Sequence, residues 1–321
     1  MSARAGRSRR RAPRGDCGWD RVAGWYDGWV GQRGSRYHRA LAIPALLDLL
    51  RPQPGEAILD VGAGQGVLAP YLLGEGVRYT GVDASPRLIS IARRRHGAGA
   101  RFFVGDAREL DRLPGVAGQR FDAAVFLLSV QDMDPLDAVL RSVASVCASE
   151  ARIVLVMTHP AFRQPRHSGW GYDPSRKLAY RRADAYLSPM SVPMKSVAGC
   201  APTRSHHRPI GGYINGLATV GFTVDAMTEL PDLPGSQRRS SRRPSVQPDV
   251  PLGIPPGVPP TPAMGSQEIP LLLGLRAVRR APPRLLNPRG PERSARHRVR
   301  PGEPRSAAER LTGVSTGPAT R

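Results

Sequence analysis

A glycine-rich turn follows an acidic residue at the end of a hydrophobic stretch. Asp60 ends the run AILD, and Gly62, Gly64 and Gly66 follow it at alternate positions. Glycines in such a turn adopt positive φ and let a ligand approach the main chain closely. Val67 stands where a dinucleotide-binding G-x-G-x-x-G would have its third glycine, so the spacing departs from the nicotinamide pattern. The turn indicates a ligand at this point, and a plain tight strand-to-helix connection is the alternative.

Two further acids end the next two predicted strands. Asp83 lies in YTGVDASP, and a carboxylate there can accept hydrogen bonds from both hydroxyls of a ribose. Asp106 lies in FFVGDARE, where it can accept a bond from the exocyclic amine of an adenine held between apolar side chains. Together the three acids indicate a nucleoside-containing ligand.

The elements that must position these acids alternate along the chain. Helices are predicted over 36–50, 67–73, 85–95, with Ser85 as N-cap, and 134–147, and strands over 57–61, 77–83, 100–106, 121–130 and 151–158. The last two strands are nearly continuous apolar runs, as expected of strands buried on both faces. This order predicts a doubly wound α/β domain, whose ligand lies at the carboxyl ends of the strands.

The order and spacing of these motifs over about residues 20–230 resemble the class I S-adenosylmethionine-dependent methyltransferases. The resemblance implies a Rossmann-like seven-stranded sheet with an antiparallel last strand, and S-adenosyl-L-methionine as cofactor. The cofactor-binding residues that it implies are Tyr26, Asp60, Gly62, Ala63, Gly64, Gly66, Asp83, Ala84, Gly105, Asp106, Ala107, Leu127 and Leu128.

A narrower likeness lies outside the cofactor motifs. WYDGWVGQRGSRYH, SVQDMDP, THPAFRQPRHSGWG, RKLAYRRADAYL and HHRPIGGYINGLATVGF are similar to a bacterial subgroup of small-molecule-type methyltransferases. The subgroup ends in an antiparallel hairpin, whose last strand is expected within 268–280. Residues 231–267 separate the two hairpin strands, where a shorter connection is usual.

Transfer of a sulfonium methyl group needs positioning and exclusion of water, and no metal is expected. A hydroxyl or acidic carbon as acceptor would also need a base. His159, directly after the fifth strand, is the first candidate, with His206 and His207 next and with His167 and His38 as further candidates. For each, a histidine that bonds only a carbonyl is the alternative. Trp25 and Tyr26 could present aromatic rings to the sulfonium, or could simply pack an N-terminal helix.

The segment 159–208 is predicted to be an insertion that forms the wall of the acceptor pocket. Its aromatic side chains suit a planar or apolar acceptor, and its arginines suit one with a carboxylate or phosphate. The run YRRADAYL could equally be a solvated helix face.

Most of the positive charge lies at the ends of the chain. Residues 16–230 carry 25 basic and 20 acidic side chains, or +5 of the net +21. The Arg-rich arm 1–15, the Pro-, Ser- and Arg-rich insert 231–267 and the basic tail 281–321 are expected to be disordered. The methyltransferase domain is then 16–230 plus 268–280. Because Arg outnumbers Lys by 45 to 2, the charge indicates a coding bias toward Arg more than a nucleic-acid surface.

Other classes of protein fit less well. Cys17, Cys147 and Cys200 are far apart, so neither disulfides nor a zinc site are expected, and a cytoplasmic location fits. The Arg-rich start lacks an apolar segment after it, and no stretch is long enough to span a membrane. LLSVQD stands where a DNA amino-methyltransferase would carry its Pro-Pro-aromatic motif. A small-molecule acceptor is favoured, while an RNA methyltransferase that uses the basic flanks and a non-catalytic cofactor-binding module remain open alternatives.

Overall fold

The computed structural model describes residues 18–176, 178–194, 202–233 and 268–279, all within one compact unit that spans Met1–Pro282. The predicted arm 1–15 and tail 281–321 lie outside these residues, as does the predicted insert 231–267 beyond residue 233. Cys17 and Cys200 also lie outside them, whereas Cys147 is buried with a free thiol. Within the described ranges, every helix falls short of the length and hydrophobicity that a membrane span needs.

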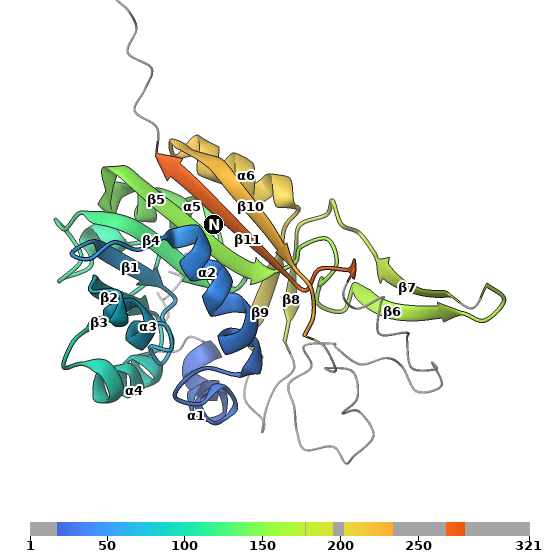
Figure 1. Ribbon diagram of the computed structural model, residues 1–321, viewed down its shortest axis with the longest axis horizontal. Helices are drawn as coiled ribbons and strands as arrows, with labels where there is room; N and C mark the ends of the chain where they lie inside the picture. Colours follow the sequence, from blue (N-terminus) through green and yellow to red (C-terminus); the bar gives the residue numbers. More distant parts are fainter. Residues whose placement is uncertain (1–17, 177, 195–201, 234–267, 280–321) are drawn as a thin grey trace, which may run out of the picture. The chain divides into compact units, whose positions relative to one another are not determined.

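A seven-stranded sheet forms the centre of the fold (Figure 1). In spatial order its strands are β10 (Phe222–Leu230), β11 (Leu272–Arg279), β5 (Cys147–Thr158), β4 (Phe121–Leu127), β1 (Ala57–Val61), β2 (Arg78–Asp83) and β3 (Arg101–Val104). Strand β11 pairs antiparallel with both β5 and β10, and the pairs from β5 to β3 are parallel. The predicted parallel sheet and its antiparallel last strand are therefore confirmed.

Helices cover both faces of this sheet. They are α1 (Gly18–Val30), the π-helix η1 (His38–Ala42), α2 (Ile43–Leu50), α3 (Ala69–Gly74), α4 (Pro86–His96), the short helices η2 (Leu110–Arg112) and η3 (Val130–Asp132), α5 (Leu136–Val146) and α6 (Ile210–Thr219). Side chains of α2, α3 and α4 belong to one core cluster, and those of α5 and α6 belong to the other. The three layers are those of a doubly wound domain.

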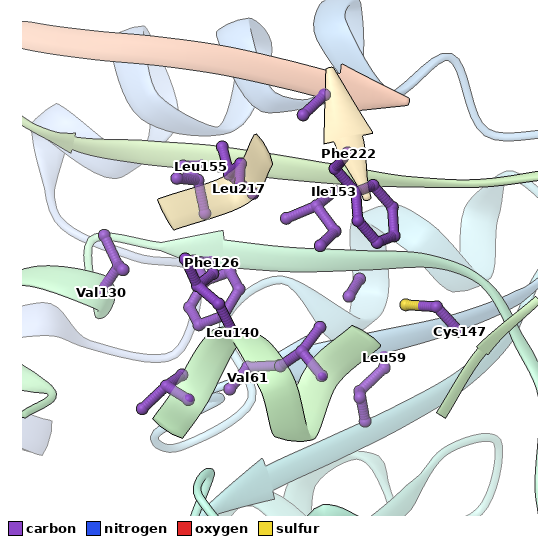
Figure 2. Close-up of a cluster of buried hydrophobic side chains, with 14 of the residues drawn as sticks. Leu59, Val61, Phe126, Val130, Leu140, Cys147, Ile153, Leu155, Leu217 and Phe222 are labelled. Carbon is purple, nitrogen blue, oxygen red and sulfur yellow. The ribbon is translucent and has the colours of Figure 1, made fainter. Parts of the chain in front are cut away.

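Strand β5 shows why the central strands are apolar throughout. Ile153 and Leu155 point into the α5–α6 core, and Val154 and Val156 point into the α2–α4 core. Successive side chains of a strand alternate between faces, so a strand covered on both sides needs apolar residues at every position. Figure 2 shows the α5–α6 core, where Leu217 and Phe222 lie near Ile153 and Leu155.

Two helix predictions have different outcomes. The Oγ of Ser85 accepts a hydrogen bond from the amide of Leu88, so the predicted N-cap of α4 is confirmed. The predicted helix 36–50 is helical throughout, but it contains the π-helical stretch His38–Ala42, where the Ile43 amide donates to the carbonyl of His38. Pro44 has no amide N–H, so it cannot continue the regular bonding pattern at this point.

The segment 159–208 forms two small sheets outside the central one. Strands β6 (Ser168–Asp173) and β7 (Leu178–Ala183) form one antiparallel hairpin, and β8 (Met190–Pro193) pairs with β9 (Arg204–His207). The helical alternative for YRRADAYL is wrong, because Tyr180 to Ala183 pair with Gly171 to Ser168 across the hairpin. Figure 1 shows the β6–β7 hairpin extending away from the central sheet.

Candidate functional site

A cavity of about 680 Å³ lies at the carboxyl ends of β1, β2, β3 and β4. This volume is within the range of small-molecule and cofactor sites. The predicted cofactor-binding residues that line it are Tyr26, Gly62, Gly64, Asp83, Ala84, Gly105, Asp106, Ala107, Leu127 and Leu128. Asp60, Ala63 and Gly66 do not line it. The structure thus brings ten of the thirteen predicted residues to one cavity.

The glycine turn after β1 needs its first two glycines for different reasons. Gly62 has φ +79°, and a Cβ atom there would lie 2.6 Å from the Cβ of Ser129. Gly64 has φ +54°, and its amide donates to the Oδ2 of Asp83 at 2.9 Å. The turn therefore lies against the loop after β4 and is tied to the end of β2. Its bare backbone faces the cavity.

The carboxylate of Asp83 is fixed by two main-chain donors. Gly64 donates to Oδ2 at 2.9 Å, and Ser85 donates to Oδ1 at 2.8 Å. Burial raises the pKa of Asp83, and these two hydrogen bonds oppose the rise. Each carboxylate oxygen can accept a second bond, so the oriented group can hold two adjacent hydroxyls.

Asp106 is engaged by its own neighbour. Arg108 donates to both carboxylate oxygens through its side chain, with Nη2 2.5 Å from Oδ2, and its amide donates to Oδ1. The Arg108 side chain holds the pKa of Asp106 below its usual range. A ligand amine at Asp106 must therefore share this carboxylate with a guanidinium.

Asp60 lies behind the turn with one oxygen unpaired. The hydroxyl of Tyr79 donates to Oδ2 at 2.6 Å, while Oδ1 is buried and has no partner. Burial raises the pKa of Asp60 to about 7, and the bond from Tyr79 opposes the rise. An unpaired buried carboxylate oxygen is stabilised by a nearby cation or donor.

Three carboxylates act electrostatically on the hydroxyl of Tyr26. Its pKa is raised, first by burial and then by the charges of Asp132, Asp83 and Asp60. Asp132 lines the cavity, and desolvation raises its pKa well above the ordinary value, with the charge of Asp83 adding to the rise. A cavity with this concentration of carboxylates fits a cationic ligand. A sulfonium that carries an amino acid group is such a ligand.

Helix α1 covers the cavity and is fastened to α4. Asp20 accepts hydrogen bonds from the hydroxyl of Ser85 and the amide of Arg87, and Asp27 forms a two-pronged ion pair with Arg95. The attachment places Tyr26 in the cavity wall. Trp25 does not line the cavity; its ring stacks on Trp29 with centroids 6.1 Å apart.

The loop after β4 has a strained residue at the cavity. Leu128 has φ +54°, a conformation that costs about 1–2 kcal/mol for a residue with a side chain. The amide of Leu128 donates to the carbonyl of Val156, and the side-chain amide of Gln131 donates to the carbonyl of Leu128. The hydroxyl of Ser129 donates to the carbonyl of Val61 at 2.6 Å. These bonds hold Leu127 and Leu128 in the wall, as the sequence predicts.

Residues in and beside η3 and β9 also line the cavity. Residues that the sequence analysis did not assign lie here, namely Ser129, Asp132, Met133, Asp134, Thr203 and Arg204. His206 joins them, with its Nδ1 3.8 Å from the Oδ1 of Asp134. Arg208 donates to the same oxygen at 2.6 Å and to the carbonyl of Met133. The motif SVQDMDP follows the end of β4 and contains two acids, so it is the sequence signal from which Asp132 could have been predicted.

The candidate histidines are separated by the structure. His206 lines the cavity, and desolvation lowers its pKa, with Asp134 opposing. His207 points to the other face of β9 and contacts the carbonyl of Tyr186 at 2.8 Å. His38 is buried against Ser35, and burial lowers its pKa to about 4.

The ring of His159 is occupied at both nitrogens. The amide of Ala161 donates to Nδ1, so Nε2 carries the proton that bonds Glu229 at 2.8 Å. His159 is 1% exposed and does not line the cavity, nor does His167. Among the described residues, no group of three His, Cys, Asp or Glu side chains is arranged to hold a metal ion.

Comparisons with known proteins agree with this geometry. Residues 58–150 match the methyltransferase domain family. The chain is 28% identical over 179 residues to an O-methyltransferase of Pyrenophora dematioidea, covering 53% of this chain and 65% of that one. It is 33% identical over 111 residues to the demethylmenaquinone methyltransferase of Beutenbergia cavernae, covering 35% and 44%. The chain thus spans less than two thirds of these relatives.

A solved structure has the same fold. It is an S-adenosylmethionine-dependent methyltransferase from Mesorhizobium loti, which is 22% identical and has a TM-score of 0.54. The match covers 74% of this chain and 96% of that one.

Proposed function

We propose that this protein, a class I S-adenosylmethionine-dependent methyltransferase by its domain and fold, transfers the cofactor's methyl group to a small-molecule acceptor. The observation that carries the proposal is one cavity at the strand ends that carboxylates and a histidine, His206, line together. The bound cofactor supplies a methyl group on a sulfonium, already activated for in-line displacement.

The nucleoside end is assigned to residues that the geometry supports. Asp83 would hold the ribose hydroxyls, and Asp106 and Ala107 the adenine. The backbone of Gly62 and Gly64 would lie along the methionine and ribose portions. Ala84, Gly105, Leu127 and Leu128 complete this wall. The unpaired oxygen of Asp60 supports a cationic ligand nearby, although Asp60, Ala63 and Gly66 do not themselves line the cavity.

The acceptor end supports His206 as the general base, ahead of His159 and His207. Its Nδ1 faces Asp134, which leaves Nε2 to take the proton of an acceptor hydroxyl. A lowered pKa keeps the ring neutral at pH 7, so it is ready to accept a proton. His159, with both nitrogens bonded, is assigned the role of linking the end of β5 to β10 across β11.

A small-molecule acceptor is supported by the residues of α1 and β9 that line the cavity, because walls from several elements suit a small molecule better than a polynucleotide. The names of the two relatives point to O- and quinone-type acceptors. The RNA alternative depends on flanks outside the described residues, and it stays a prediction, as does the cytoplasmic location.

Calorimetry with S-adenosylmethionine, S-adenosylhomocysteine and NAD tests the cofactor. We expect saturable binding of the first two and none of NAD. Incubation with methyl-labelled cofactor and cell extract then tests the acceptor, with products sorted by size. We expect label in molecules below the size of proteins and RNA. Label confined to RNA or protein would refute the acceptor class, and loss of label in His206→Gln with unchanged cofactor binding would support the base.

A further inference from the structure

Buried cationic side chains gather outside the cavity, at the base of the β6–β7 hairpin. Arg163 and Gln164 lie between β5 and β6, and Arg181 lies on β7. None of the three lines the cavity described above. Five of their polar atoms are buried without a hydrogen-bond partner, namely both Nη atoms of Arg163, both amide atoms of Gln164 and Nη1 of Arg181.

The Arg163 side chain is anchored but not satisfied. It is 7% exposed, and its Nε donates to the carbonyl of Pro270 at 3.3 Å. Its amide donates to the carbonyl of His159, which fixes the backbone beside β5. Both terminal nitrogens of the guanidinium are therefore held in place with no acceptor. A guanidinium presents this pair of donors to the two oxygens of a carboxylate or phosphate.

The Arg181 side chain is held from three sides. Its Nε donates to the carbonyl of Phe162 at 2.8 Å, and Nη2 donates to the hydroxyl of Ser168 at 3.0 Å. Its guanidinium lies 5.6 Å from the centre of the Trp170 ring. These contacts fix the plane of the guanidinium and leave Nη1 as the free donor. Such fixed orientation lowers the entropic cost of binding.

The charges in this cluster do not balance. The pKa of Arg181 is lowered to about 10, first by desolvation and then by the like charge of Arg163. Asp232 is a buried carboxylate that attracts both guanidiniums, but none of their nitrogens donates to it. Among the described residues, two guanidiniums, one buried and one half-buried, thus face one buried carboxylate. A buried charge without a paired partner is strongly unfavourable.

A water molecule could satisfy donors here, but it would leave the excess positive charge. An anionic oxygen group would satisfy the donors and also balance the charge. Gln164 adds an amide donor for a further oxygen. We propose that Arg163, Gln164 and Arg181 form a binding site for a carboxylate or phosphate group.

The unpartnered atoms are closed to solvent in the structure, so we expect a ligand to enter when the base of the hairpin opens. Strands β6 and β7 pair with each other and not with the central sheet. An opening there breaks no hydrogen bond of the seven-stranded sheet. The anion has two sources, a free ion or the anionic group of a larger small molecule such as the methyl acceptor.

Inorganic phosphate is the probe for the test, titrated into the full-length protein at constant ionic strength with chloride as the balancing ion. We expect saturable binding of one phosphate per chain by calorimetry, and a rise in thermal midpoint. Arg163→Gln and Arg181→Gln should each weaken binding at least tenfold. Arg182→Gln is the matched control, since Arg182 is the exposed neighbour on β7, and it should bind as the parent does.

Arg163→Gln removes a buried guanidinium whose terminal nitrogens have no acceptor, so without phosphate we expect its thermal midpoint to equal or exceed that of the parent. Absence of saturable phosphate binding to the parent, or equal binding by parent and both site variants, would overturn the proposal. Binding needs no methyl transfer, so failure of the proposed function leaves this test intact. Where transfer to an extract is measurable, competitive inhibition by phosphate assigns the site to the acceptor, and unchanged transfer assigns it to a free ion.

Discussion

Replacement of Asp83 by Asn probes the nucleoside end of the cavity with the smallest change in shape. The parent carboxylate accepts one main-chain hydrogen bond at each oxygen, from Gly64 and from Ser85. The Asn amide keeps one acceptor and puts an NH₂ group opposite the other main-chain donor. The variant therefore loses one of these bonds and the negative charge that strengthens the rest.

The magnitude follows from these contacts. An unsatisfied buried donor costs about 1–3 kcal/mol of folding stability. A hydrogen bond to a charged group contributes about 1.5–3 kcal/mol, so losing the equivalent of one such bond to ribose weakens cofactor binding roughly tenfold to more than a hundredfold. Burial raises the pKa of Asp83, so parent binding should weaken as pH falls, beginning at higher pH than for an ordinary aspartate. The variant lacks this dependence.

Calorimetry with S-adenosylhomocysteine and with its 2′-deoxy analogue measures the effect. The loss caused by Asp83→Asn should shrink for the analogue, because one hydroxyl partner is already missing. Asp122→Asn is the matched control: Asp122 also accepts a main-chain bond, from Ala57, but at the opposite end of β1. If Asp83→Asn binds both ligands within threefold of the parent, Asp83 does not hold the ribose.

Three further expectations follow from the site. Gly62→Ala should destabilise folding by about 1–3 kcal/mol in urea unfolding, because its Cβ would lie 2.6 Å from the Cβ of Ser129 at a positive φ; unchanged stability would show that the loop yields freely. His206→Gln should slow methyl transfer about 10²- to 10⁴-fold with unchanged cofactor affinity, whereas His159→Gln should lower the thermal midpoint and leave the rate within a few-fold; the opposite pattern would restore His159 as the base. In the ligand-free protein, burial raises the folded-state pKa of Asp60 to about 7. Its contribution to stability is therefore present below the unfolded pKa of about 4 and is lost as pH rises through about 7. Asp60→Asn should remove this loss, and parallel pH profiles of unfolding free energy for the parent and the variant would contradict it.

The nucleoside end could be predicted from sequence because its signals are local. Each acid directly follows an apolar strand, and parallel strands bring their carboxyl ends to one edge. Asp83 and Asp106 therefore both line the cavity, although they lie on different strands and are distant in the sequence. The Asp106–Arg108 ion pair was not predicted, although it could have been, because its two residues are only two positions apart in the sequence.

The acceptor end depends on contacts between distant segments. His159 follows a strand just as Asp83 does, but its ring is bonded to Glu229, 70 residues away on β10. The position of His206 depends on the pairing of β8 with β9, which places alternate residues toward the cavity. Short hairpins outside the main sheet carry no long apolar run, so the sequence pattern alone could not decide between strand and helix at Tyr180.

The fastening of α1 to α4 has a kinetic consequence. The cover over the cavity is attached largely through carboxylates, and the Asp27–Arg95 pair is about one-fifth exposed. Dissolved salt screens partly exposed ion pairs while it leaves buried apolar contacts nearly unaffected. We therefore expect ionic strength to weaken the attachment of α1 to α4 more than it changes the stability of the sheet beneath, and cofactor exchange to become salt-dependent if α1 has to move for it.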